Sequence, residues 1–372
     1  MAGASLRFAA LLTCSSLGAM RTGQFRTPTL NQFPRLLLAE WRKLKLPTAD
    51  ETVIVAVSGG ADSTALLLGL HELRSASKLS VQICVAHLDH KLRKSSTKDA
   101  KWVAELAENL GYECVVGRSK VAELAELNSD NLEQAARAAR YAFLERTAKR
   151  KSAKYVLTGH TMDDQAETVL LGLMRGSAGA GLGGMDLLRP LRANSSIKLA
   201  RPLLWARRIE TENYCRLRKT KFLSDEMNFD QKFARVKVRE QLLPLMQSFN
   251  NKIVEALSRT ASQLREDSAV LINDSDALLK RAAVLDHLED ETETPVLDVK
   301  VLAAAPSALR RRALRQWISE ARGSSRRLEM VHLVAVEKLL EGTAGGRLVE
   351  LPGGSRVRRK RNRLEFETTE NV

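Results

Sequence analysis

The sequence predicts an α/β protein: a doubly wound parallel sheet, followed by a helical segment and a small α+β domain at the carboxy terminus. The main observation is that short apolar runs rich in β-branched residues alternate with longer amphipathic patterns between Asn31 and Leu223. Such alternation is typical of strands and helices that follow one another in βαβ units. The length of 372 residues also exceeds that of an average domain and predicts two or three compact units.

The first predicted element is an amphipathic helix over Asn31–Leu46, with Phe33 and Trp41 on its apolar face. The run Thr52–Val57 follows, and its apolar, β-branched character predicts a strand that is buried on both faces. The same two patterns then alternate along the chain. They predict helices over Thr64–Leu73, Thr97–Leu110, Asn131–Lys149 and Asp163–Met174, and strands over Val81–His87, Tyr112–Val116 and Tyr155–Thr158.

Four segments divide the chain. Residues 1–30 are expected to be a leader that is disordered or precedes the true start, because the apolar run after Arg7 only loosely resembles a targeting segment and is too short to span a bilayer. Residues 31–224 form the α/β domain. Residues 225–290 form a helical connector with a long helix over Lys252–Leu288. Residues 296–372 form a basic domain with helices over Leu309–Ala321 and Met330–Leu340 and a hairpin over Arg347–Phe366.

The charge of the chain favours a polyanionic partner. Lysine and arginine number 59 against 44 acidic residues, which gives a net charge of +15 and a pI of about 9.8. A basic excess of this size favours nucleic acid, since phosphate backbones release counterions when cations bind them. The four cysteines lie far apart, without a Cys-x-x-Cys pair, which favours reduced thiols in the cytoplasm over disulfides or a thiolate-held metal.

The turn Ser58–Ser63, which we call the phosphate loop, lies directly between a predicted strand and a predicted helix. Its glycines allow the backbone to approach an oxyanion, and the free N–H groups of the helix start point toward it. Asp62 is acidic, so it would hold the loop or position Mg²⁺ instead of donating to phosphate. An ordinary glycine-rich turn is the alternative. The spacing fits neither a Walker loop nor a Rossmann fingerprint.

The loop sequence Ser-Gly-Gly-Ala-Asp-Ser resembles the signature of the PP-loop ATP pyrophosphatases, whose fold is that of the adenine nucleotide α hydrolases. These enzymes split ATP between its α and β phosphates, adenylate a carbonyl oxygen and release pyrophosphate. An ordered series of further motifs resembles the tRNA(Ile)-lysidine synthetase family from about Val53 to Pro244, and weakly beyond. The series comprises His87–Arg93, Asn131–Glu133, Ala136–Arg137, Arg140–Tyr141, Thr158–Thr168, Arg175–Ser177, Gly181–Met185, Arg201–Leu204, and Asp225 with Asn228, Arg235, Arg239 and Pro244.

The resemblance implies an ATP site where the strands end, which is where open α/β sheets bind ligands. The residues expected to contact ATP are Ser58, Gly59, Gly60, Ala61, Asp62, Ser63, His87, Arg137, Gly159 and His160. A contact with ATP is not the one interpretation of these residues. The alternative for His87 and His160 is an ordinary polar position in a loop, and the alternative for Arg137 and Arg140 is a stripe of solvated charge on a helix.

The resemblance also implies a reaction on RNA. The C2 oxygen of the wobble cytidine in isoleucine tRNA with a CAU anticodon attacks ATP, and L-lysine then displaces AMP to give lysidine, which changes codon specificity from AUG to AUA. Asp62, Asp163 and Glu167 are the expected catalytic residues, with Asp62 as the candidate Mg²⁺ ligand. The residues expected to hold lysine or tRNA are Asp163, Asp164, Glu167, Arg175, Arg201, Arg235 and Arg239.

Several alternatives stay open at this point. Asp163, Asp164 and Glu167 share a helix face, but an acidic helix start exposed to solvent would look the same. In the carboxy-terminal domain, Arg310–Arg312, Arg326–Arg327 and Arg356–Arg363 favour a tRNA clamp with Trp317 as a stacking surface; solvated charge around a core tryptophan is the alternative. A homodimer is neither required nor excluded.

Three other functions compete with this interpretation. A tRNA thiolase of the same superfamily would rely on suitably placed cysteines, which the sequence lacks. A nucleotide synthetase of the GMP type would carry a glutamine amidotransferase unit, and none is visible. An RNA-binding module with a degenerate loop would have no need of the intact Asp62 and Ser63.

Overall fold

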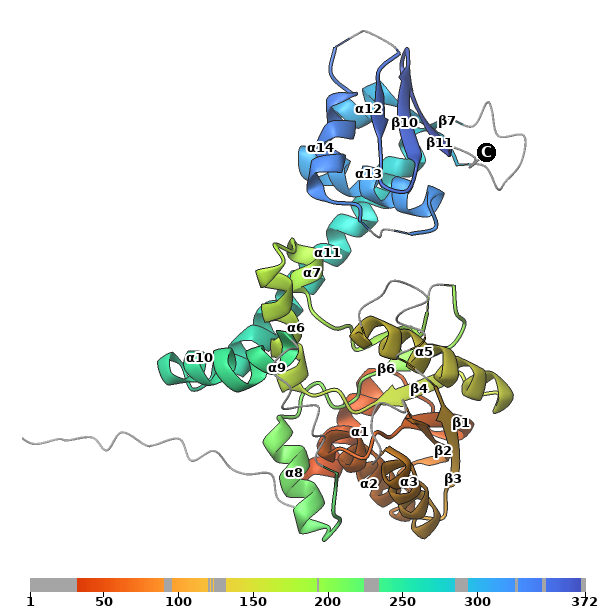
Figure 1. Cartoon of the computed structure of the whole chain (residues 1–372), viewed down its shortest axis with the longest axis vertical. Helices are drawn as coiled ribbons and strands as arrows, with labels where there is room; N and C mark the ends of the chain where they lie inside the picture. Colours follow the sequence, from red (N-terminus) through yellow and green to blue (C-terminus); the bar gives the residue numbers. More distant parts are fainter. Residues whose placement is uncertain are drawn as a thin grey trace, which may run out of the picture.

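The computed structural model describes residues 32–89, 96–119, 121, 123, 132–192, 194–223, 234–284, 294–324, 327–342 and 346–368. The expected leader, Asp225 and Asn228 lie outside these residues. Figure 1 shows an α/β domain and a carboxy-terminal domain, with one long helix running between them. No helix in the described ranges combines the length and apolar character needed to cross a membrane.

The larger domain is built on a six-stranded sheet of order β3-β2-β1-β4-β6-β5. Neighbouring strands are parallel, apart from β5, which pairs antiparallel with β6 at one edge. The doubly wound parallel sheet predicted from sequence is therefore confirmed. The strands are β1 (Ala49–Ala56), β2 (Ser80–Asp89), β3 (Glu113–Arg118), β4 (Tyr155–Thr158), β5 (Leu188–Pro190) and β6 (Lys198–Ala200).

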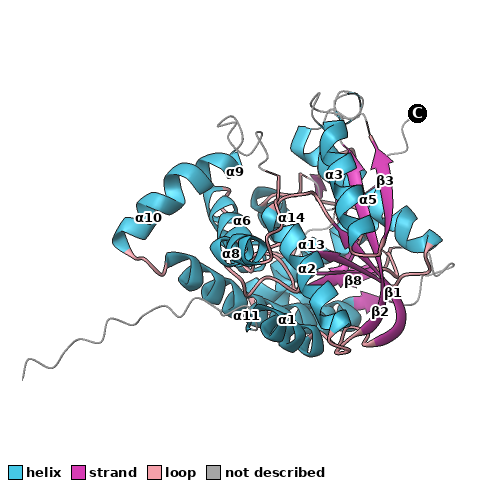
Figure 2. Ribbon diagram, turned by 90° about the horizontal axis from the view of Figure 1, so that it is seen from below, coloured by secondary structure: helices cyan, strands magenta, loops and turns pink. Residues whose placement is uncertain are grey.

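Helices cover both faces of this sheet (Figures 1 and 2). Because side chains alternate along a strand, Val53 and Val55 of β1 pack into one core with α1, α2, α3 and α8, whereas Ile54 packs into a second core with α5. Each fully buried side chain of this size contributes about 1.5–3 kcal/mol to stability. The helices are α1 (Gln32–Lys43), α2 (Ala61–Ser75), α3 (Ser96–Asn109), α5 (Leu132–Arg150) and α8 (Arg208–Leu217).

A group of helices joins the sheet domain to the rest of the chain. Ala166 and Leu170 of α6 pack against Val238, Leu243 and Val254 in a small separate core. Helix α11 also contacts α6 and continues to the carboxy-terminal domain (Figure 1). It ends at Ala282, six residues before the predicted Leu288. The elements are α6 (Met162–Met174), α7 (Gly179–Leu182), α9 (Ala234–Lys237), the π-helix η2 (Val238–Leu242), α10 (Leu243–Phe249) and α11 (Ile253–Ala282).

The carboxy-terminal domain is a five-stranded antiparallel sheet of order β7-β8-β11-β10-β9 packed with helices, as the predicted α+β class requires. Trp317 is 2% exposed and donates from Nε1 to the Pro295 carbonyl over 2.8 Å. The stacking role considered for it is therefore wrong. The elements are β7 (Ala283–Val284), β8 (Val296–Asp298), α12 (Val299–Ala304), α13 (Ser307–Ala321), α14 (Met330–Lys338), β9 (Leu348–Glu350), β10 (Ser355–Lys360) and β11 (Arg363–Thr368).

Candidate functional site

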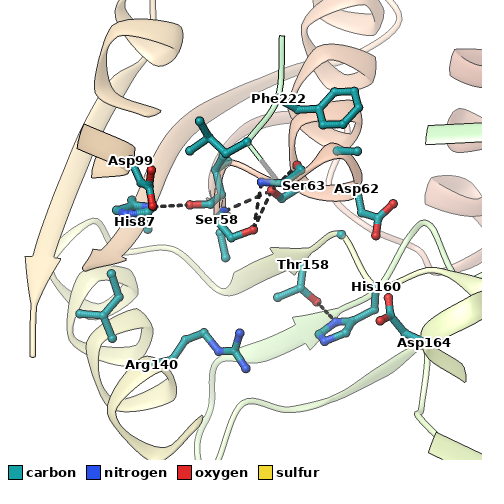
Figure 3. Close-up of a pocket in the computed structure, with 18 of the residues that line it drawn as sticks. Ser58, Asp62, Ser63, His87, Asp99, Arg140, Thr158, His160, Asp164 and Phe222 are labelled. Carbon is teal, nitrogen blue, oxygen red and sulfur yellow. Dashed lines mark hydrogen bonds between the residues drawn. The ribbon is translucent and has the colours of Figure 1, made fainter. Parts of the chain in front are cut away.

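A cavity of about 550 Å³ opens where β1, β2 and β4 end. The phosphate loop lines one side of it, together with His87 near the end of β2, Thr158 at the end of β4 and His160 just after β4 (Figure 3). Because all three strands are parallel, their carboxyl ends bring these residues to one edge of the sheet. This is the arrangement that was expected from the sequence.

Hydrogen bonds within the loop fix its shape. Ser63 Oγ accepts from the Ser58 backbone N–H over 3.1 Å and lies 3.1 Å from the Gly60 carbonyl, to which it donates. Gly59 has a φ of +96°, a conformation that L side chains rarely adopt. Helix α2 begins within the loop, at Ala61, so the N–H groups of its first turn lie at the cavity wall. The serine hydroxyls thus hold the loop, and a helix start at this place favours the binding of an anion.

Gly159 brings the end of β4 against the phosphate loop. A Cβ atom built at this position would lie only 2.8 Å from the backbone carbonyl of Asp62 and the Cα of Ser63. Contacts this short are essentially never observed for a real Cβ. The glycine therefore permits a close approach of two backbone segments that a larger residue would separate.

His87 is buried, His160 is half-buried, and both rings are neutral. His87 Nδ1 lies 2.8 Å from the Val57 carbonyl, so this nitrogen carries the proton and donates. His160 Nδ1 lies 2.8 Å from the Thr158 hydroxyl. Burial lowers the pKa of both rings, to about 3 for His160, although the Asp164 carboxylate opposes the shift there. Both side chains therefore present a polar, uncharged edge to the cavity.

The carboxylate of Asp62, in the phosphate loop, faces Arg208 and Thr211 of helix α8. Burial, and next the Asp164 carboxylate, raise the pKa of Asp62 to about 6, against the lowering influence of Arg208 and Thr211. The Thr211 hydroxyl donates to one carboxylate oxygen, and Arg208 Nε lies 3.5 Å from the other. A single carboxylate that faces a phosphate site suits Mg²⁺, which usually takes its remaining ligands from phosphates and water. No cluster of three metal-ligating side chains occurs within the described ranges.

The carboxylates of α6 face inward and are not a solvated helix start. The side chains of Asp163, Asp164 and Glu167 are 16%, 13% and 0% exposed. Asp164 Oδ2 caps the helix by accepting from the Thr161 backbone N–H over 2.9 Å. Asp163 accepts from Arg207 Nε over 3.1 Å. The prediction that these residues share one face is confirmed, and the solvated alternative is wrong for Glu167.

Four arginines complete this cluster. Two of them, Arg207 and Arg208, were not predicted from the sequence. Arg208, at the start of α8, contacts Asp62, Asp164 and Glu167. Glu167 also binds Arg235 and Arg239, at 3.5 and 2.7 Å, so these two predicted substrate residues pair with a carboxylate in this structure. The one sequence signal for α8 was Glu210 three residues after Arg207, a spacing that resembles a capping box.

A second cluster surrounds Tyr141 on helix α5. The guanidiniums of Arg137 and Arg189 lie 4.8 and 5.4 Å from its ring centroid. Burial opposes ionisation of the phenol, but the surrounding arginines outweigh it and lower the pKa of Tyr141. Arg140, in the same cluster, lines the cavity and extends toward Thr158 and His160 (Figure 3). So much positive charge beside the phosphate loop favours an anionic ligand.

Not every predicted site residue lines the cavity. Among the described residues, those absent from its lining are Gly59, Arg137, Asp163, Glu167, Arg175, Arg201 and Arg235. Arg201 is 1% exposed, and burial lowers its pKa to about 10. Its positive charge therefore acts on the Tyr141 phenol, and its buried side chain is not exposed to RNA. Arg175 is the exposed residue that ends α6, and it is absent from the described lining of the cavity.

Ion pairs neutralise part of the basic run in the carboxy-terminal domain. Arg310 and Arg311 both contact Glu337, at 2.6 Å each. Along β10 and β11, Arg358 contacts Glu367 at 2.7 Å and Lys360 contacts Glu365 at 2.6 Å. Sequence counting therefore overstated the positive charge that this domain offers to a polyanion.

Comparison with known proteins identifies the family. The family model of a PP-loop domain matches residues 36–246, and that of a TilS substrate binding domain matches residues 297–365. The tRNA(Ile)-lysidine synthases of Gloeobacter violaceus and Rhodococcus erythropolis are 38% and 40% identical to this chain, over 76% and 82% of it and over 81% and 84% of their own lengths. The chain belongs to the tRNA(Ile)-lysidine synthase family.

Other members of this family are longer. The chain spans 65% of the tRNA(Ile)-lysidine synthase of Geobacter sulfurreducens, at 37% identity over 85% of this chain, and 57% of that of Thermus thermophilus. Among solved structures, the U34-tRNA thiolase NcsA from Methanococcus maripaludis, described with its [4Fe-4S] cluster, matches with a TM-score of 0.52 at 16% identity, over 64% of this chain and 80% of that one. The likeness to the thiolase concerns the fold alone.

Proposed function

We propose that this chain ligates L-lysine to C2 of the wobble cytidine of isoleucine tRNA with a CAU anticodon, in an ATP-dependent reaction that releases pyrophosphate and AMP. The observation that carries the proposal is the cavity itself. It places the phosphate loop beside the inward-facing carboxylates of α6, with Asp62 and Asp164 both in its wall (Figure 3). A nucleotide phosphate and a cationic amine can therefore be held side by side.

The first step activates the base. The C2 oxygen of cytidine attacks the α phosphorus of ATP, and the bond from that phosphorus to the bridging oxygen breaks, which releases pyrophosphate. The loop N–H groups and Arg140 would hold the phosphates and stabilise the charge that develops on them. Asp62 would hold Mg²⁺, which offsets phosphate charge when it is bound. The neutral edges of His87 and His160 would line the nucleotide site without adding charge.

The second step transfers lysine. The ε-ammonium of lysine must lose a proton before its nitrogen attacks C2; the C2–O bond then breaks, AMP leaves, and the nitrogen loses a second proton. Asp163, Asp164 and Glu167 would hold the ammonium near the activated base. A nearby carboxylate that does not hold Mg²⁺ would accept the first proton.

The helical connector and the carboxy-terminal domain would hold the tRNA. Residues 225–290 and 296–372 would contact the tRNA body, with Arg175 as an exposed contact on α6. All the residues named belong to one chain, so the proposal needs no second subunit. An enzyme of this kind acts where tRNA and ATP are found, and the free cysteines fit the reducing cytoplasm.

The test incubates the purified protein with an isoleucine tRNA transcript, ATP, Mg²⁺ and labelled lysine. We expect acid-precipitable label that depends on ATP, and none with a transcript that carries uridine at the wobble position. Well-folded protein that adds no lysine, or that adds sulfur when a sulfur donor is supplied, would contradict the proposal.

A further inference from the structure

Arg208 connects the nucleotide side of the cavity to the carboxylate side. Its Nε lies 3.5 Å from Asp62 Oδ2, its Nη2 lies 3.1 Å from Asp164 Oδ1, and its Nη1 lies 3.3 Å from Glu167 Oε1. Arg208 itself lines the cavity and is 23% exposed. One guanidinium therefore touches the phosphate loop and the proposed amine-binding carboxylates at the same time.

Each of four carboxylates in this cluster has a guanidinium partner without any substrate. Four carboxylates, those of Asp62, Asp163, Asp164 and Glu167, meet four guanidiniums, those of Arg207, Arg208, Arg235 and Arg239. Arg207 also pairs with Glu255, at 2.7 Å. A lysine ammonium that enters this cluster would find each of the four carboxylates already neutralised. A cation must leave before another can bind there with comparable strength.

Among the three carboxylates of α6, Asp164 is the one that a movement of Arg208 would free. Within the described part of the chain its one ion pair is with Arg208, whereas Glu167 keeps Arg235 and Arg239 if Arg208 moves. The phosphates of ATP would enter on the Asp62 side, beside the weakest of the three Arg208 contacts. Guanidinium binds phosphate through two parallel hydrogen bonds, so the charge of ATP competes well for Arg208.

We propose that Arg208 couples the binding of the two small substrates: it occupies the amine site while ATP is absent, and turns to the ATP phosphates when ATP binds, which frees Asp164 for the lysine ammonium. The inference rests on the proposed function. Coupling of this kind is reciprocal, so lysine must strengthen ATP binding by the same factor. It also gives an order of events, because lysine is held firmly only when ATP is already in place.

The test measures the lysine dissociation constant by calorimetry with the full chain, without nucleotide and with saturating α,β-methylene-ATP and Mg²⁺. In the wild type we expect the nucleotide analogue to tighten lysine binding at least about tenfold. In Arg208→Gln we expect lysine to bind without the analogue about as tightly as the wild type does with it, and the analogue to change this by less than about threefold. The control, Arg216→Gln, changes an exposed arginine on the same helix that pairs with Glu212, and should behave as the wild type.

Two results would overturn the inference. One is a tenfold coupling that persists in Arg208→Gln. The other is a loss of lysine binding in this variant under both conditions, which would mean that Arg208 merely holds the carboxylates in place. If neither ATP analogue nor lysine binds to the wild type, the proposed function fails together with the inference, so the two failures are distinguishable.

A second variant covers the case in which Arg208→Gln does not fold. Arg208→Lys keeps the positive charge, but a single ammonium cannot span three carboxylates and then a phosphate in the same way. We expect it to fold and to lose at least about threefold of the coupling. Unchanged coupling in Arg208→Lys would contradict the proposed role of the guanidinium.

Discussion

Arg239 binds Glu167 through two parallel contacts, from Nε to Oε1 over 2.7 Å and from Nη2 to Oε2 over 3.2 Å. The two residues come from η2 and α6, 72 positions apart in the chain. Glu167 itself is fully buried, and Arg235 and Arg208 surround its remaining side. The pair therefore ties the connector helices to the helix that carries the proposed amine site.

Neutralising Glu167 should destabilise the fold. Glu167→Gln keeps the shape of the side chain but leaves three guanidiniums, each between a fifth and a third exposed, without their shared carboxylate. We expect the free energy of unfolding to fall by about 2 kcal/mol, less than for a fully buried pair because water screens the arginines. Urea unfolding measures it. Glu105→Gln, which breaks the exposed pair with Lys101, should cost less than about 0.5 kcal/mol, and an equal loss in both variants would contradict the account.

The glycines of the site should respond differently to alanine. At Gly60 a Cβ would meet only Ser58 Oγ, at 3.7 Å, so Gly60→Ala should leave the stability almost unchanged. If phosphate lies against the loop, however, the added methyl should weaken ATP binding by about tenfold or more. Gly159→Ala should lower both the stability of the fold and the affinity for ATP, because the added Cβ would overlap the Asp62 backbone. Thermal unfolding measures the stability of the two variants, and titration with ATP measures their affinity. Unaltered ATP binding in Gly60→Ala would contradict a close approach of phosphate to the loop.

The raised pKa of Asp62 should make stability depend on pH. Since burial and Asp164 raise this pKa from 3.8 to about 6, the folded protein takes up the proton at a higher pH than the unfolded chain does. Asp62 therefore favours the folded state more as the pH falls from 7 to 5, and this gain is lost as the pH rises through 6. Relative to Asp62→Asn, the wild type should gain about 1 kcal/mol over that interval. Denaturant unfolding at the two pH values measures it, and parallel behaviour of the two proteins would argue against the shift.

Arg140 should contribute to nucleotide binding more than to folding. It lines the cavity and extends toward Thr158 and His160, whereas Arg137 packs over the Tyr141 ring. We expect Arg140→Gln to weaken ATP binding about tenfold, as the loss of one charge-assisted phosphate contact would. Arg192→Gln removes an exposed arginine that pairs with Glu145 and should leave ATP binding unchanged. Equal effects of both variants would indicate only a loss of general positive charge.

Local patterns in the sequence predicted much of the fold and part of the site. The strand over Tyr155–Thr158 agrees with the structure at both ends, and the phosphate loop follows β1 and leads into α2 as expected. The shared face of Asp163, Asp164 and Glu167 follows from helix geometry alone. These features depend on residues that are neighbours in the chain, which is why a single sequence contains them.

The remaining features depend on pairs that are distant in the chain. Arg208 meets Asp62 across 146 positions, and no local pattern marks that contact. Arg358 and Glu367 meet because β10 and β11 pair in a particular register, which determines whether a basic run is free or neutralised. Arg201 follows β6 and looks like a ligand contact by its position, yet packing has buried it.

The most direct test of the account follows the α phosphorus of ATP in the absence of lysine. Protein, isoleucine tRNA transcript and Mg²⁺ are incubated with ATP that carries radioactive phosphorus at either the α or the γ position, and the tRNA is then recovered. We expect label to reach the tRNA from the α position only, to require the wobble cytidine, and to be released as AMP when lysine is added. Transfer from the γ position, or a folded, ATP-binding protein that never labels the tRNA, would contradict this expectation.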